Sequence, residues 1–153
     1  MVARALGGRL SNVMNRAERA LQLLLRFGGV TMLTAFFTIF LPVRWMAATH
    51  AWLGLGEFPA APLVDYLTRS LSLLYAWHGG LLLVLSFQIQ RYRPVLLYLG
   101  IATAIGGLIL LGIDLHAGMP AYWTSMEGPP VAVIGCLMVW LTLQCRENDE
   151  PTD

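Results

Sequence analysis

Residues 65–87 read DYLTRSLSLLYAWHGGLLLVLSF, and this stretch decides the fold of the chain. It is long enough to cross a bilayer, which takes about 20 mostly apolar residues in a helix, yet Arg69 lies near one end. A charge inside a membrane segment costs about 2.5–3.5 kcal/mol on insertion scales, so it normally has a partner and faces protein or water. The stretch therefore predicts a transmembrane helix packed in a bundle, with Arg69 paired.

The two faces of this helix differ in character at about 100° per residue. One face is polar and small and is expected to point into the bundle. It comprises Asp65, Arg69, Ser72, Ala76, Gly79, Gly80, Leu83 and Phe87. The other is mostly leucine and is expected to point toward lipid. It comprises Leu71, Leu74, His78, Leu82 and Leu85.

The composition is that of an integral membrane protein. The 153 residues are 57% hydrophobic and 12% charged, against roughly 25% charged in a soluble domain. The length suits one domain with room for four helices. The net charge of +1 gives no indication of nucleic-acid binding, and the lipid bilayer is the expected partner.

The apolar segments predict an all-α protein, an integral membrane four-helix bundle. The expected spans are 20–41, 66–88, 95–113 and 129–145, which make up a transmembrane domain over 20–145. Pro42 ends the first span, and Glu127-Gly128-Pro129-Pro130 is interpreted as the start of the fourth, because proline is tolerated in a first helical turn.

The segments outside these spans have their own patterns. Residues 1–19 mix arginines with leucine, valine and methionine, which predicts a basic amphipathic helix on the cytoplasmic membrane surface. Residues 42–65 are aromatic and broken by glycine and proline. We expect an ordered outer interfacial cap there, with Arg44–Leu53 helical and its tryptophans at headgroup level. Residues 146–153 are a solvated, acidic cytoplasmic tail.

Small residues predict how the helices pack. Gly28, Thr31, Ala35 and Thr38 share one face of the first span, where they let a neighbouring helix approach closely. Gly100, Thr103, Gly107 and Asp114 share one face of the third. This face is expected to meet the arginine-bearing face of the second helix.

The distribution of arginines predicts the orientation. One side of the membrane has Arg44 and Arg69. The other has Arg4, Arg9, Arg16, Arg19, Arg26, Arg91, Arg93 and Arg146. Cytoplasmic loops carry the excess of arginine, so both termini are expected in the cytoplasm of a bacterium, with the chain in its inner membrane.

Charged residues gather at the outer helix ends, and we interpret them as the candidate site. Arg69 and Asp114 each have the unfavourable sign for the dipole of their own helix, so mutual pairing would offset that cost. The first interpretation is a structural clamp that fixes helix register. The second is an outer cavity that binds an ion or polar ligand. Both involve Asp65, Arg69, Asp114 and Glu127.

Histidine and cysteine patterns do not point to a cofactor. His50 and His116 are potential additions to the outer site, but no metal-ligand spacing such as HExxH supports a metal. Only His78 lies within a span, whereas bis-histidine haem needs two. His78 is interpreted as a packed histidine hydrogen-bonded to a neighbouring backbone, with a contact to another subunit as the alternative. Cys136 and Cys145 are too far apart on one helix to form a disulfide. No catalytic motif is present, so no enzyme is indicated.

The stretches LTRSLSLLYAWHG, RYRPVLLYLG and DLHAGMPAYWTSMEGPP resemble small uncharacterised bacterial four-span membrane proteins, which are distantly DoxX-like. The resemblance covers roughly residues 41–143. It implies a small four-helix bundle, with some relatives being accessory subunits of quinone or thiol redox systems. This chain lacks a pair of thiols within the membrane, and no catalytic residue carries over.

Three functions remain open at this stage. The first is a non-catalytic accessory or assembly subunit of a membrane complex, with other membrane subunits as partners. The second is a binder of a small molecule, quinone, lipid or ion that uses the outer cluster of Arg69, Asp114 and Glu127. The third, a redox component with its own cofactor, has the least support because no ligand pair for a cofactor is present.

Overall fold

The computed structural model describes residues 15–59 and 61–145, and their regular structure is entirely helical, as predicted. The segment 1–14, expected to be amphipathic, and the acidic tail 146–153 lie outside the described residues. The helices are α2 (Arg16–Leu33), α3 (Ala35–Thr38), α4 (Val43–Trp52), α5 (Pro62–Leu85), α6 (Arg93–Ala117) and α7 (Ala121–Gln144).

Three stretches of the described chain are long and apolar enough to cross a membrane, which supports the prediction of a membrane protein. They are Arg16–Thr38, which joins α2 and α3, then α6 and α7. α5 is 24 residues long, but its charges and its histidine leave it outside this group. The first span begins at Arg16 rather than at residue 20, and it is interrupted at Thr34, whose hydroxyl donates to the carbonyl of Thr31.

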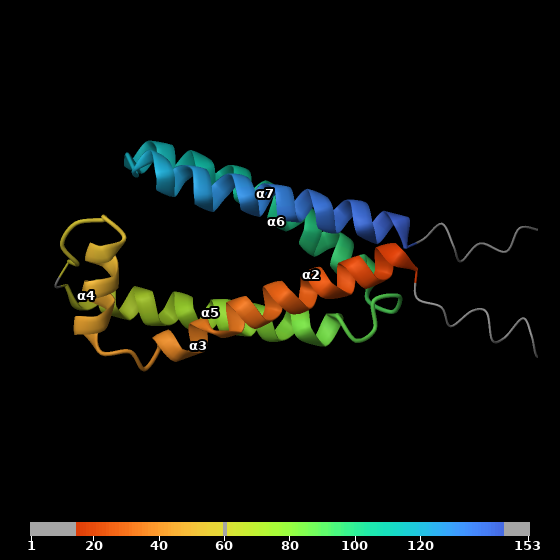
Figure 1. The fold of residues 1–153 in the computed structure, drawn as a ribbon, viewed down its shortest axis with the longest axis horizontal. Coiled ribbons are helices and arrows are strands. Elements are labelled where there is room, and N and C mark those ends of the chain that lie inside the picture. Colours follow the sequence, from red (N-terminus) through yellow and green to blue (C-terminus); the bar gives the residue numbers. More distant parts are fainter. Residues whose placement is uncertain (1–14, 60, 146–153) are drawn as a thin grey trace, which may run out of the picture.

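The helices form two antiparallel pairs (Figure 1). α2 and α3 pack along α5, and α6 packs along α7. The predicted close approach on the first span exists, but its centre is Gly29 rather than the Gly28 face. A methyl group at Gly29 would lie 2.9 Å from the carbonyl oxygen of Gly79, and one at Gly79 would lie 2.6 Å from that of Gly29. The two backbones are therefore in direct contact.

The partner predicted for α6 is wrong: its small face packs against α7, not against α5. Both helices of this pair place small residues at steps of four and three. A methyl group at Gly107 would lie 2.3 Å from the nitrogen of Ala132, and one at Gly135 would lie 2.2 Å from the nitrogen of Ala104. This repeated match of small residues lets the two backbones touch along the pair, whereas Gly79 on the small face of α5 is in contact with Gly29 of α2.

The predicted start of the last helix is also wrong. α7 begins at Ala121, directly after Pro120, and Pro129 and Pro130 lie inside it. The motif that resembled a first turn is therefore the middle of a helix. Prolines donate no N–H, so the carbonyls of Ser125 and Met126, four residues earlier, have no helical donor. Gly128 is needed instead for packing, since a methyl group there would lie 2.7 Å from the nitrogen of Leu111.

The inner face of α5 is predicted correctly in its first half and wrongly in its second. Ser72, Ala76 and Gly79 are buried, as expected. However, Leu82 and Leu85, assigned to the lipid face, are buried too, whereas Phe87 is exposed. The reason is that the hydrophobic core lies at this end of α5, where the helix packs against α2 and against the loop that follows α5.

The two pairs meet at the end of the molecule where α2 begins and α7 ends (Figure 1). Leu21 and Leu25 of α2 join Met138 and Leu141 of α7 in one buried cluster, which also includes Leu82, Leu85, Ile89, Leu96 and Cys145. The burial of these apolar side chains holds the pairs together at this end.

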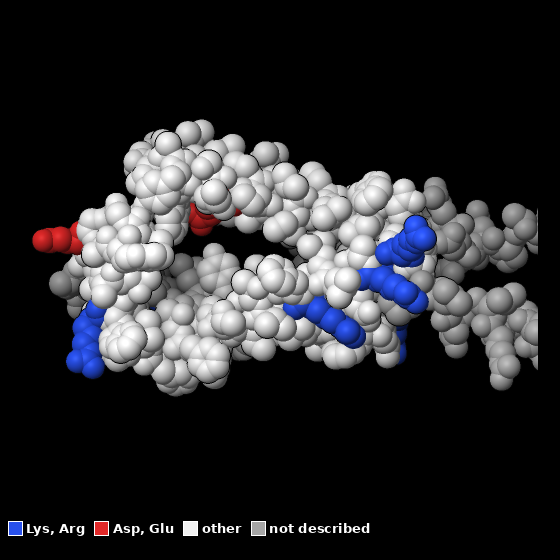
Figure 2. Space-filling view, in the orientation of Figure 1, with Lys and Arg blue, Asp and Glu red and all other residues white. Residues whose placement is uncertain are grey.

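At the opposite end, α4 and the loop after it form the connection (Figure 1). The helix Val43–Trp52 agrees with the predicted Arg44–Leu53 segment, and Trp45 and Trp52 are exposed. The helix is followed by turns at Gly54 and Gly56, whose positive φ angles of 71° and 87° suit glycine. The hydroxyl of Tyr122, in the first turn of α7, donates to the carbonyl of Leu53. Between these two connections, Figure 2 shows an opening that separates the α2–α5 pair from the α6–α7 pair.

Candidate functional site

Arg69 lies in a set of three hydrogen bonds at the end of the α2–α5 pair that is nearest to α4. Its Nε donates to Asp65 Oδ1 at 3.0 Å, an ion pair within one turn of α5. Its Nη2 donates to the carbonyl of Leu41 at 3.2 Å, and its Nη1 donates to that of Ile39. The side chain is 31% exposed. Arg69 therefore holds the end of the first span against α5.

The local sequence explains why a cation is needed there. The chain leaves α3 and reaches Pro42, which has no N–H and cannot close a turn on the carbonyl of Ile39. Carbonyls at the end of a helix need donors from elsewhere, and a cation there also interacts favourably with the helix dipole. Arg69 supplies the hydrogen-bond donors and the positive charge, so it acts as a side-chain cap contributed by a different helix.

The four predicted site residues lie on different helix pairs, two on the α2–α5 pair and two on the α6–α7 pair. Arg69 pairs with Asp65, whereas Asp114 and Glu127 belong to the α6–α7 pair. In residues 15–59 and 61–145, the Arg69–Asp65 contact is the one ion pair, so the expected joint cluster of Arg69 with Asp114 and Glu127 does not form. The clamp is built from one carboxylate and two backbone carbonyls.

Asp114 is buried, with 5% of its surface exposed. It lies one turn beyond Leu111 on the face of α6 that packs against α7. Its carboxylate oxygen Oδ2 is inaccessible and has no hydrogen-bond donor within the described part of the chain. Its backbone carbonyl accepts from the N–H of Met119 as the chain turns through Gly118, which has a φ of 68°.

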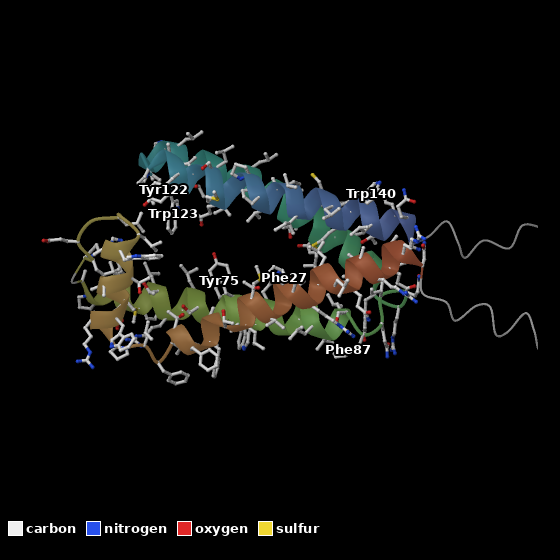
Figure 3. All side chains as sticks on the ribbon, viewed as in Figure 1. Phe27, Tyr75, Phe87, Tyr122, Trp123 and Trp140 are labelled. Atoms are coloured by element: carbon white, nitrogen blue, oxygen red, sulfur yellow. The ribbon has the colours of Figure 1, made fainter. Side chains whose placement is uncertain are left out.

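Glu127 is half-buried on α7 and accepts a hydrogen bond from the indole Nε1 of Trp123, one turn earlier. Figure 2 shows an acidic residue on the side of the α6–α7 pair that faces the opening, and Asp114 and Glu127 are the acidic residues of that pair. In Figure 3, Trp123 of α7 and Tyr75 of α5 lie on the facing sides of the two pairs. An oriented carboxylate and two aromatic side chains thus lie around the opening.

The aromatic residues of this region were not singled out in the sequence. The signal was present, because Trp123 and Glu127 are four residues apart and so share a helix face. It was concealed because the spans predicted at 95–113 and 129–145 leave residues 114–128 between two helices. Tyr122, whose hydroxyl donates to the carbonyl of Leu53, was missed for the same reason.

The three histidines lie on three different helices, His50 on α4, His78 on α5 and His116 on α6. His50 Nδ1 lies 3.1 Å from the carbonyl of Gly56, and its ring makes an edge contact with Phe58, so it stabilises the turn after α4. His116 is exposed at the end of α6, and His78 is half-buried on α5. In the described residues no group of three or more His, Cys, Asp and Glu side chains could hold a metal ion. Cys136 is exposed and Cys145 is buried, and no disulfide joins them.

Comparisons of the chain with protein-family models, with curated proteins and with solved structures find no match. The DoxX-like resemblance therefore stays an expectation from the sequence.

Proposed function

We propose that this chain is a non-catalytic, four-span protein of the bacterial inner membrane. It would act as an accessory or assembly subunit whose partner inserts a transmembrane helix into the opening between the two helix pairs. The observation that carries the proposal is the separation of the pairs, which are connected through the core at one end and through α4 at the other. In a bilayer such an opening is filled by lipid or by protein.

The fourth span in this proposal is α5. At 1.5 Å per residue, its 24 residues extend over about 36 Å, enough to cross the hydrocarbon core. It runs beside α2, in backbone contact at Gly29 and Gly79, so it occupies the same depth. Most of its exposed side chains are large and apolar, including Leu74, Trp77 and Val84. Arg69, which lowers the hydropathy of α5 together with Asp65 and His78, is already paired with Asp65.

The proposed orientation leads to a labelling experiment. In a background with Cys136→Ala and Cys145→Ala, a cysteine at Ala48 of α4 should react with a membrane-impermeant maleimide in intact cells. Cysteines at Ser11 and Thr152 should react only after the membrane is permeabilised, because the arginine excess places both termini in the cytoplasm. Labelling at positions 11 and 152 with protection at position 48 would invert the topology.

A second candidate function is favoured by the pair Trp123–Glu127. The indole holds the carboxylate in one orientation beside the opening, and Tyr75 faces it from α5. Such an arrangement suits a small molecule with an apolar body and one hydrogen-bond donor, for instance a lipid or quinol head. This version of the binder uses Glu127 without Arg69, since Arg69 is occupied by the clamp.

Mild purification of the full chain, followed by mass spectrometry of bound proteins and small molecules, tests both candidates. The subunit proposal expects a stoichiometric membrane protein with the wild type, strongly reduced by Trp123→Ala and retained by the matched control Trp140→Ala at the other end of α7. A small molecule lost from Trp123→Ala and from Glu127→Gln would favour the second candidate instead. Turnover of a substrate by the purified chain alone would refute both.

A further inference from the structure

A groove of about 620 Å³ lies between the start of α6 and the end of α7. It is on the opposite end of the molecule from the Arg69 clamp, where Figure 2 shows arginines on the surface. Its polar wall is formed by Gln90, Arg91 and Arg93, and its apolar wall by Pro94, Leu97 and Leu143. It plays no part in the function proposed above.

The two arginines of this groove have no carboxylate partner in the described residues. Arg93 Nη2 reaches the carbonyl of Thr142 at 3.4 Å, and its buried Nε has no hydrogen-bond partner among residues 15–59 and 61–145. Arg91 Nη1 reaches Gln88 Oε1 at 3.4 Å, and its guanidinium lies 5.7 Å from the ring centre of Tyr92. Each of these bonds is long and uses one Nη group, so the other Nη group of each guanidinium is left to bind an acceptor.

The electrostatics of the groove favour an anion. Arg93 is the first residue of α6, where the positive end of the helix dipole adds to its charge rather than opposing it. A guanidinium presents its N–H groups in a planar fork that matches the oxygens of a phosphate group. A phosphate bound in the groove would accept hydrogen bonds from the Nη groups of Arg91 and Arg93 and would neutralise two like charges.

The apolar wall distinguishes a lipid from a free anion. Leu97 and Leu143 continue the groove along α6 and α7, on the exposed surface of two helices that are apolar enough to cross the membrane. Inorganic phosphate would leave this wall unused. A phospholipid would place its phosphate at the arginines and an acyl chain along the leucines.

We infer that this groove binds the headgroup of an anionic phospholipid, with Arg91 and Arg93 as the phosphate-binding residues and Leu97 and Leu143 in contact with an acyl chain. The inference depends on the membrane location of the chain and not on the accessory role or on the opening between the pairs.

The test is native mass spectrometry of the full chain from nanodiscs that contain equal amounts of phosphatidylglycerol and phosphatidylcholine. The wild type is expected to retain phosphatidylglycerol in preference. The double variant Arg91→Gln/Arg93→Gln should lose at least tenfold of that preference, because the loss of even one charge-assisted hydrogen bond corresponds to about that factor. Arg16→Gln/Arg19→Gln is the matched control, because it removes the same charge from exposed positions at the same end, outside the groove.

Three results would overturn the inference. The first is an equal loss in the control, which would mean that total charge rather than the groove attracts the lipid. The second is displacement of the lipid by millimolar inorganic phosphate, which would identify a site for the free anion. The third is a preference for phosphatidylglycerol that appears only when the acidic residues of the tail are neutralised, in Glu147→Gln/Asp149→Asn/Glu150→Gln. That result would mean that the acidic tail, rather than a lipid, occupies the groove. Arg93→Lys is the control for folding. If this variant gives a normal elution profile in size-exclusion chromatography, a loss of lipid from it is not caused by a loss of folding.

Discussion

Gly107→Ala is expected to lower the free energy of unfolding by about 3 kcal/mol, toward the upper limit of what overpacking costs. The added methyl group would lie 2.3 Å from the nitrogen of Ala132 and 2.7 Å from the carbonyl oxygen of Gly128. Both are backbone atoms of α7, which cannot move aside as a flexible side chain could. The helices must therefore separate, and they would lose contact along the whole pair. Titration with SDS in mixed micelles, followed by circular dichroism, measures the effect.

Gly106→Ala is the matched control, since it is the preceding residue on the same helix and a methyl group there would have no neighbour within 4 Å. Its stability should be unchanged or raised by up to about 1 kcal/mol, because alanine is the better helix former. Equal destabilisation by both variants would mean that the close α6–α7 packing does not exist as described.

Arg69→Gln is expected to destabilise the chain by about 2 kcal/mol. Hydrogen bonds to charged groups contribute about 1.5–3 kcal/mol each, and the partial exposure of Arg69 reduces their sum. The variant leaves the carbonyls of Ile39 and Leu41 without their donor, at a point where Pro42 cannot replace it. The same SDS titration applies, and faster proteolysis of the 39–42 segment should accompany the loss.

Asp65→Asn separates the two components of this clamp. It removes the ion pair and leaves both carbonyl bonds in place, so it should cost only about 0.5 kcal/mol, as for partly exposed pairs one helical turn apart. If Asp65→Asn were as harmful as Arg69→Gln, the carboxylate rather than the end of α3 would be the main partner of the arginine.

Much of the architecture could be predicted from local sequence. Long apolar runs predict helices and a membrane location because backbone polar groups must be satisfied within the segment. The helix Val43–Trp52 and the turns after it could be predicted from the pattern of that segment, which is broken by Gly54 and Gly56. The requirement that Arg69 be paired also followed from residue type alone, since an isolated charge is costly in such a helix. These features depend on composition and on spacing within one segment.

The tertiary structure decided which segments meet. Small residues occur on α2, α5, α6 and α7, and a single helix does not reveal its partner; only the matching steps of Gly100, Ala104 and Gly107 with Ala132 and Gly135 select the α6–α7 pair. Glu127-Gly128-Pro129-Pro130 is locally compatible with a helix start, but contact of Gly128 with α6 extends the helix back to Ala121. The partners of Arg69 are backbone carbonyls, which every residue carries, so no sequence pattern could point to Ile39 and Leu41 before the helices were packed.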